Sequence, residues 1–164
     1  MIVISDTSPI INLAIIGHLH LLPAVFNEVV IPTAVYNEIT LTGAGLPGSA
    51  EIAVANWVSV VSVKNRSLVD SFRAELQIGE SEAIVLAMEL KADLLLIDEA
   101  LGRAIASKNG LKIMGLLGVL IVAKQKGLIP EVKTLINRLL VEADFWISNQ
   151  LINQVLAEAG EIYG

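Results

Sequence analysis

Residues 2–11 read IVISDTSPII, and residues 94–100 read LLLIDEA. In both stretches a short apolar run leads to an aspartate, Asp6 in the first and Asp98 in the second. Apolar runs without polar alternation are typical of strands that are buried on both faces of a parallel sheet. A carboxylate beside such a run is unfavourable unless it caps a helix, pairs with a cation or binds a metal ion. The two stretches therefore predict two buried strands, and they raise the question of what the two acids do.

Strand-like and helical patterns alternate along the whole chain. The predicted strands are Ile2–Ser5, Val29–Ile31, Val58–Val63, Leu94–Ile97 and Leu111–Met114. The predicted helices are Ser8–Ile16, Pro32 to about Thr40, Gly79–Lys91, Glu99–Asn109, Leu116–Lys126, Pro130–Leu140 and Ser148–Ala159. This alternation predicts an α/β fold with a parallel sheet of about five strands. A chain of 164 residues fits one domain. We expect a single domain over 1–164, in which 129–164 form a helical segment that packs on it or lies at an interface.

Composition narrows the class of protein. The chain has no Cys, which excludes disulfides and thiolate ligands and fits a reducing compartment. It is 54% hydrophobic, but its longest apolar stretch, Ile113–Ala123, falls short of the roughly 20 residues that cross a bilayer. No basic segment precedes the N-terminal apolar run, so we expect no signal peptide. We therefore expect a soluble, cytoplasmic protein that does not enter a membrane.

Charge argues mildly against non-specific binding to nucleic acid. The net charge is −6, whereas such binding calls for a basic surface. The charge is uneven, however, because residues 1–63 contain no Lys or Arg and most basic residues lie in 64–126. A local basic rim is therefore compatible with the sequence.

Four acids are candidates for a shared site. Ligands of open parallel sheets bind beyond the carboxyl ends of the strands, and Asp6 and Asp98 both follow strands. Glu38 and Glu82 lie on predicted helices that follow other strands. Glu80 is two residues from Glu82, a spacing that turns the two side chains to opposite sides of a helix, so at most one of them joins the site. We expect the set Asp6, Glu38, Glu82 and Asp98.

A cluster of carboxylates needs a counter-charge. Two carboxylates ~5 Å apart repel each other by roughly 3 kcal/mol at an effective dielectric constant near 20. A hard divalent cation removes this conflict, and Mg²⁺ or Mn²⁺ prefers oxygen ligands while keeping waters that leave room for a phosphate. The chemistry that follows is metal-assisted hydrolysis of a phosphodiester.

The ordered motifs resemble those of a known family. They are Asp6-Thr7-Ser8, Glu38 in a Pro-x-x-Val-x-x-Glu setting, Glu82-Ala83-Ile84, and Asp98 after an apolar strand. In order, spacing and context they resemble the four-acid pattern of the PIN (PilT N-terminus) domain family, over nearly the whole chain to about residue 127. Within that family the chain is most similar to a small prokaryotic branch, through Gly79–Ile84, Ile97–Arg103 and Phe145–Ser148. It departs from the commoner pattern by carrying Glu at positions 82 and 99.

The resemblance implies an architecture and an activity. It implies a three-layer α/β/α sandwich around a central parallel sheet, and metal-dependent cleavage of single-stranded RNA, often as the toxin of a toxin–antitoxin pair. It further implies a small antitoxin protein as partner, and we expect a homodimer. By this resemblance Mg²⁺ or Mn²⁺ is held by Asp6, Glu82 and Asp98, with Glu38 as a ligand or through water. The implied supporting residues are Ser8 and Thr7, which orient Asp6 or a water, and Arg103, which contacts the substrate phosphate.

Each of these residues also has a purely structural interpretation. Asp6 and Asp98-Glu99 suit helix caps, and acids such as Glu80 and Glu82 complement the dipole of a helix N-terminus. Arg103 suits a surface ion pair, and Glu38 a solvated helix flank. The pair His18 and His20 is disfavoured as a metal site, because residues two apart share a face only on a strand.

The remaining features favour packing roles. We interpret Gly115-Leu116-Leu117-Gly118 as helix packing, because it lacks the Lys-Ser/Thr ending of a phosphate loop. Trp57, Phe145 and Trp146 are interpreted as core or interface residues rather than as a platform for bases. The apolar residues of the C-terminal helix either cover the sheet or contact a second copy or an inhibitory partner.

Two other functions stay open. One is a catalytically silent PIN-like scaffold that binds protein. The other is a receiver-type signalling module that binds Mg²⁺, but such a module needs a Lys after its last strand, where this chain has Gly115.

Overall fold

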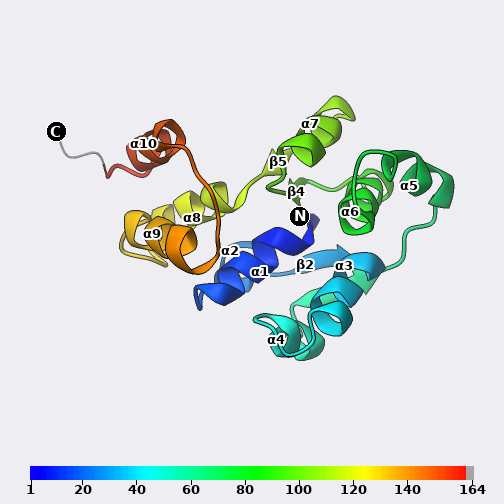
Figure 1. Ribbon diagram of the computed structural model, residues 1–164, viewed down its shortest axis with the longest axis horizontal. Helices are drawn as coiled ribbons and strands as arrows, with labels where there is room; N and C mark the ends of the chain where they lie inside the picture. The colour runs from blue at the N-terminus through cyan, green and yellow to red at the C-terminus, as the bar shows by residue number, and fades with distance from the viewer. Residues whose placement is uncertain (162–164) are drawn as a thin grey trace.

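Five short strands form one sheet in which every pairing is parallel. Their order across the sheet is β3-β2-β1-β4-β5 in the computed structural model, which describes residues 1–161 (Figure 1). The strands are β1 (Val3–Ser5), β2 (Val29–Pro32), β3 (Val58–Val61), β4 (Leu94–Leu96) and β5 (Ile113–Met114). Each lies within, or one residue beyond, a segment predicted from sequence, so the parallel sheet of about five strands is confirmed.

Helices fill the connections between the strands. They are α1 (Thr7–Ile15), α2 (Leu21–Phe26), α3 (Thr33–Asn37), the π-helical turn η1 (Glu38–Thr42), α4 (Ser49–Val54), α5 (Arg66–Phe72), α6 (Ile78–Glu89), α7 (Ala100–Lys108), α8 (Leu116–Gln125), α9 (Lys133–Glu142) and α10 (Asn149–Glu158). The sequence did not predict α2, α4 and α5. These helices have six or seven residues, which is too short for a helical period to show.

The two faces of the sheet carry separate hydrophobic cores. Leu94 and Leu96 belong to one core, while Leu95 and Ile97 belong to the other, because successive side chains of a strand point to opposite faces. Helices α1, α8 and α9 contribute to the first core, and α5, α6 and α7 to the second. Figure 1 shows α8, α9 and α10 on one side and α5 and α6 on the other. The strands are therefore apolar on both faces because both are covered, and the three-layer α/β/α prediction is confirmed.

The register of the central strands sets the position of the acids. Ser5 of β1 is paired with Leu96 of β4, and the Asp6 amide donates a hydrogen bond of 3.0 Å to the Leu96 carbonyl oxygen. Asp6 and Asp98 therefore leave adjacent strands at the same carboxyl edge of the sheet.

The C-terminal segment is tied to the rest of the chain by a buried carboxylate. Glu161 accepts hydrogen bonds from the amides of Val132 (2.6 Å) and Lys133 (3.0 Å) and from Lys124 Nζ (2.9 Å). Val155 and Leu156 of α10 are buried in the first core. In the part of the chain that the structure describes, α10 thus packs on the first core, and residues 162–164 of the predicted segment lie outside the described residues.

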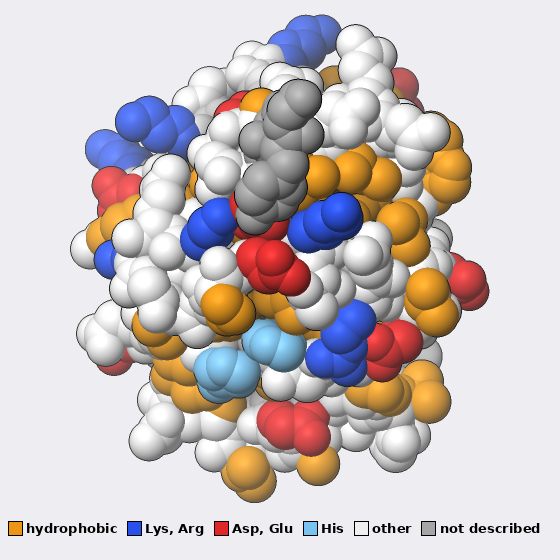
Figure 2. Space-filling model, turned by 90° about the vertical axis from the view of Figure 1, so that its left-hand side faces the viewer, with side chains coloured by type: hydrophobic (Ala, Val, Ile, Leu, Met, Phe, Trp, Pro, Cys, Tyr) orange, Lys and Arg blue, Asp and Glu red, His pale blue; other side chains and the backbone are white. Residues whose placement is uncertain are grey.

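The face seen in Figure 2 includes the C-terminal helices, and it carries charges of both signs between apolar side chains. The rings of His18 and His20 lie side by side there, with centroids 5.4 Å apart. His18 Nδ1 lies 2.7 Å from the Ile16 carbonyl oxygen, an interaction that uses this nitrogen as a donor. Within residues 1–161, no helix combines the length and apolar character that a bilayer span requires.

Candidate active site

Asp6 is a buried carboxylate at the carboxyl end of β1. Only 3% of it is exposed, and it stands at the N-cap position of α1 without a side-chain hydrogen bond of capping geometry. Burial raises the pKa of Asp6 from 3.8 to about 7, although a weaker interaction with the Thr7 amide lowers it. Three further carboxylates add to the rise in this pKa, in the order Glu80, Glu38 and Asp98. Capping therefore does not account for Asp6, and acids surround it.

A small cavity of about 70 Å³ lies at Asp6. The residues that line it are Asp6, Thr7, Ser8, Glu38, Gln77, Gly79, Glu80 and Glu99. Thr7 Oγ1 donates a hydrogen bond of 2.7 Å to Glu38 Oε2, so Thr7 fixes Glu38 rather than Asp6. A Cβ on Gly79 would lie 2.8 Å from the same Glu38 oxygen, so the glycine leaves room for this carboxylate. Within residues 1–161 the lining includes four acids and no basic side chain.

Asp98 is held by the start of α8. Its Oδ1 accepts a hydrogen bond of 2.8 Å from the Leu116 amide, while its buried Oδ2 has no hydrogen-bond partner within residues 1–161. Burial raises the pKa of Asp98, while the Leu116 amide and Arg103 lower it and Glu99 raises it. A Cβ on Gly115 would lie 2.9 Å from Asp98 Oδ1 and 3.0 Å from Arg103 Nη1. The glycine therefore lets a carboxylate and a guanidinium approach the same loop.

Arg103 lies beside Asp98 on α7. Its Nη1 donates a hydrogen bond of 2.8 Å to the Ile97 carbonyl oxygen. This bond fixes the guanidinium at the carboxyl edge of β4, next to the acids. The role in phosphate binding that the resemblance implies stays a prediction.

The structure brings Glu80 to Asp6 and turns Glu82 elsewhere. Glu82 is buried, but its Oε2 accepts a hydrogen bond of 2.8 Å from Arg66 Nη1 and its Oε1 one of 3.0 Å from the Ala34 amide. It does not line the cavity at Asp6. Burial raises the pKa of Glu80, and the neighbouring carboxylates raise it further. The predicted grouping of Glu82 with Asp6 is therefore replaced by a grouping that contains Glu80, because the phase of α6 carries Glu82 toward α3 and α5.

The comparison with known families fits this arrangement of a parallel sheet and strand-end acids. A family model named DUF3368 and described as a PIN domain matches residues 2–161. The chain is a PIN domain. No curated protein matched the sequence significantly. PIN domains are generally nucleases, and they typically use divalent metal ions.

The donor atoms in this PIN domain suit a hard divalent cation. They are carboxylate oxygens, which Mg²⁺ and Mn²⁺ prefer, and one of them, Asp98 Oδ2, is buried without a partner within the described chain. Among residues 1–161 no three acidic or histidine side chains already stand at the spacing of a metal-ligand set. The carboxylates that would hold such an ion are those of Asp6, Glu38, Glu80 and Asp98.

Sequence reasoning missed three features of the site of this PIN domain. Glu80 was not chosen because helical spacing shows only that Glu80 and Glu82 face opposite sides of the helix, and not which of them faces the site. Glu99 was considered as a cap and as a departure from the family pattern but was not placed in the site, yet it lines the cavity and makes no side-chain capping hydrogen bond to α7. Gly115 was assigned to helix packing, and its contacts are with side chains from other elements. The available signal was the position of Gly115 directly after a strand, at the edge where Asp6 and Asp98 also lie.

Proposed function

We propose that this PIN domain is an Mg²⁺- or Mn²⁺-dependent endoribonuclease that hydrolyses phosphodiester bonds in single-stranded RNA. The observation that carries the proposal is the cluster of five acids formed by Asp6, Glu38, Glu80, Asp98 and Glu99, which we call the acid cluster. Its central carboxylate is buried and its pKa is raised to about 7 by burial and by its neighbours. Charges arranged in this way are costly unless a cation joins them.

The chain's own residues would divide the work of such a site. Asp6, Glu80 and Asp98 would hold the ion, and Glu38 would act as a further ligand or through water. When bound, a divalent ion supplies activation of water and stabilisation of negative charge on the phosphate. Leu116 orients Asp98 through its amide, and Thr7 orients Glu38 through its hydroxyl.

Two other groups would position the substrate. Arg103, fixed on the Ile97 carbonyl oxygen, places a guanidinium where a phosphate would enter, and Arg readily binds phosphate through paired N–H groups. Ser8 lines the cavity at Asp6 and offers a hydroxyl to a water or a phosphate oxygen. Both residues are therefore proposed to act on the substrate rather than on the ion.

The hollows beside the acid cluster support a single strand as substrate. On the β2 side lies a pocket of about 510 Å³ that includes Glu38 and Gln77, and on the β5 side lies one of about 490 Å³ that includes Asp98 and Arg103. The cluster thus lies between two depressions along the sheet edge. A flexible strand can follow such a path more readily than a stiff duplex.

The test is cleavage of a 5′-labelled single-stranded RNA and of the same sequence as a duplex, with Mg²⁺, with Mn²⁺ or with EDTA. We expect cleavage of the single strand that requires the ion and is lost in Asp6→Asn. Asp70→Asn, which changes an exposed aspartate on α5, is the control and should cleave normally. Absence of cleavage under every condition would favour the competing hypothesis of a silent, protein-binding PIN domain.

The resemblance to toxins extends the proposal. We propose a cytoplasmic toxin that acts as a homodimer and is paired with a small antitoxin protein. A gene for a small protein next to this one, and co-purification of the two products, would support the pairing. Sedimentation of the purified chain at several concentrations tests the homodimer, which requires a mass of twice 17.5 kDa.

A further inference from the structure

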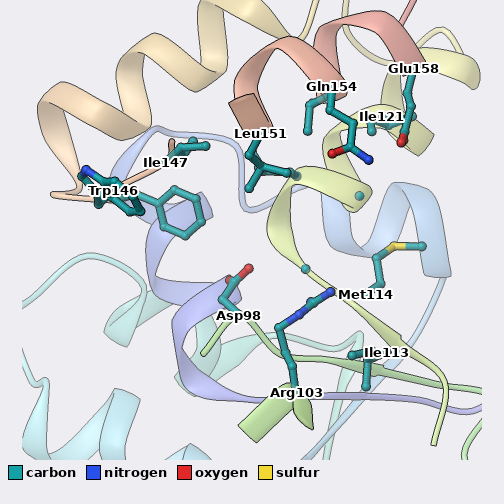
Figure 3. A pocket seen from close by; sticks show the side chains of 15 residues that line it. Asp98, Arg103, Ile113, Met114, Ile121, Trp146, Ile147, Leu151, Gln154 and Glu158 are labelled. Carbon is teal, nitrogen blue, oxygen red and sulfur yellow. The ribbon is translucent and has the colours of Figure 1, made fainter. Parts of the chain in front are cut away.

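A pocket of about 490 Å³ lies next to the acid cluster on the β5 side, and we call it the side pocket. Asp98 and Arg103 stand at one side of it, and Gln154 and Glu158 of α10 stand at the other (Figure 3). Its volume falls in the range of ligand-binding pockets, roughly 300–1,000 Å³. The side pocket therefore opens directly onto residues of the proposed site.

The wall of the side pocket between α9 and α10 is aromatic. Phe145, Trp146 and Ile147 line it. Ile147 is 6% exposed, whereas Trp146 is 83% exposed, so Trp146 does not have the core role that was one of the two roles expected for it, core or interface. An indole left this open beside a carboxylate site offers a flat surface on which a base can stack.

The opposite wall offers polar groups from one face of a helix. Gln154 and Glu158 are four residues apart on α10, so their side chains are neighbours on its surface. Figure 3 shows both side chains next to Ile121 of α8, with their polar ends toward the pocket. A carboxylate accepts hydrogen bonds only, and a carboxamide both accepts and donates. These groups suit a planar ligand whose edge carries amino hydrogens.

This wall is fixed rather than loosely placed. Val155 of α10 is buried in the core beneath it, and Lys124 Nζ donates a hydrogen bond of 2.7 Å to the Ala159 carbonyl oxygen at the end of the helix. Glu161, just beyond, is bound by Lys124 and by two amides of α9 and the turn before it. The side pocket is therefore built into the fold by the buried side of α10 and by hydrogen bonds at its C-terminal end.

We propose that the side pocket receives one nucleobase of the RNA strand, next to the phosphate at Asp98 and Arg103, and prefers a base with an exocyclic amino group. This inference rests on the proposed ribonuclease function. Trp146 and Phe145 stack on the base, and Gln154 and Glu158 accept hydrogen bonds from its amino group. Adenine, cytosine and guanine are therefore favoured over uracil, which has no amino group.

The test uses Trp146 as its own reporter. The chain has two tryptophans, so Trp57→Phe leaves Trp146 as the only one, and Asp6→Asn in the same chain prevents cleavage during the titration. The probes are an eight-residue oligouridylate and versions with one adenosine, cytidine or guanosine at successive positions. We expect saturable quenching of Trp146, and about 10-fold tighter binding when the amino base stands at one particular position.

Matched variants separate the pocket from the helix surface. Gln154→Ala should reduce the preference for amino bases, whereas Gln150→Ala, an exposed residue of the same helix outside the pocket, should leave it unchanged. Trp146→Ala in the chain that keeps Trp57 should weaken binding of a labelled oligonucleotide about 10-fold, because stacking on an aromatic residue contributes substantially to single-strand binding.

The outcomes of these experiments test the base-binding pocket separately from the proposed ribonuclease function. Equal binding of all oligonucleotides, with Gln154→Ala and Gln150→Ala alike, would overturn the pocket even if the wild-type chain cleaves RNA. Base-dependent quenching in a chain that never cleaves RNA would support the pocket and overturn the nuclease. Trp146 fluorescence that follows protein concentration and not RNA, together with a dimer by sedimentation, would assign the surface to a second copy and also overturn the inference.

Discussion

Glu80 and Glu82 lie two residues apart on α6, but their carboxylates have opposite surroundings. The Glu82 carboxylate receives a guanidinium from Arg66 and an amide hydrogen from Ala34. The Glu80 carboxylate faces further acids, and its pKa is raised by burial and then by the charges of Glu99 and Glu38. Glu82 is compensated by other groups of the chain, whereas Glu80 has no donor or cation as a partner within residues 1–161.

The contrast shows how to separate a structural acid from a functional one. A carboxylate that leaves water needs donors or a positive charge, and Glu82 finds both within the fold. Asp6, Glu80 and Asp98 gain too few of either, and one oxygen of Asp98 has no partner within residues 1–161. The missing compensation is what a bound cation would provide. If burial were the only criterion, Glu82 would have been chosen as the functional acid.

The largest difference between substitutions of the two glutamates should be in the rate of RNA cleavage. If the acid cluster holds the ion, Glu80→Gln should lower kcat/KM on single-stranded RNA about 100-fold, since loss of one electrostatic group in an active site typically costs about 10²–10³. Glu82→Gln should stay within about threefold of wild type when rates are normalised to folded protein. Equal losses in both variants would show that the two glutamates do not differ in function, and a larger loss in Glu82→Gln would make Glu82 the functional acid.

The pH dependence of stability should come from the uncompensated acids. Because the pKa of Asp6 is about 7 in the folded chain and near 3.8 in its ordinary state, the folded chain binds more protons between these pH values. Stability therefore falls as pH rises through this window, by on the order of 2 kcal/mol between pH 5 and pH 8 for metal-free protein. Urea unfolding at several pH values measures it.

Two variants sharpen this measurement. Asp6→Asn should flatten the fall and should be more stable than wild type at pH 8 without metal, whereas Glu82→Gln should keep the slope. A wild-type chain whose stability rises from pH 5 to pH 8 would contradict the raised pKa of Asp6.

At a fixed pH, substitution of Glu82 should lower stability more than substitution of Glu80, which is the reverse of their order in cleavage. Glu82→Gln removes the charge that pairs with Arg66, and we expect a loss of about 1–2 kcal/mol in the free energy of unfolding. Glu80→Gln removes repulsion, so metal-free protein should be unchanged or slightly more stable. Denaturant unfolding in EDTA compares them, and a clear destabilisation by Glu80→Gln would show that this acid is structural.

The sequence was sufficient for the features that depend on local pattern. The apolar runs before Asp6 and Asp98 predicted two buried parallel strands, and the rule that ligands bind at the carboxyl edge placed both acids together. The sequence could not show which of Glu80 and Glu82 joins the site, because this depends on where Arg66 and the Ala34 amide lie in space. These partners belong to α5 and α3, and the hydrophobic periodicity of α6 does not show where they lie.

Exposure was equally hard to predict. Trp146 follows Phe145 in a segment that reads as apolar, and only the path of the chain between α9 and α10 leaves its indole in solvent. Gly115 looks like part of a helix-packing motif until Asp98 and Arg103 arrive from β4 and α7. For Gly115 the deciding contacts are with segments distant in sequence.

The most direct test of the central claim is the thermal midpoint of wild type, Glu80→Gln and Glu82→Gln with and without Mg²⁺. A ligand at 100 times its Kd stabilises the folded state by about 2.7 kcal/mol, which corresponds to roughly 5–10 °C for a chain of this size. We predict that Mg²⁺ raises the midpoint of wild type and of Glu82→Gln by this amount and leaves Glu80→Gln unchanged. A full shift in Glu80→Gln together with none in Glu82→Gln, or no shift in wild type, would contradict the assignment of the uncompensated acids as the cation site.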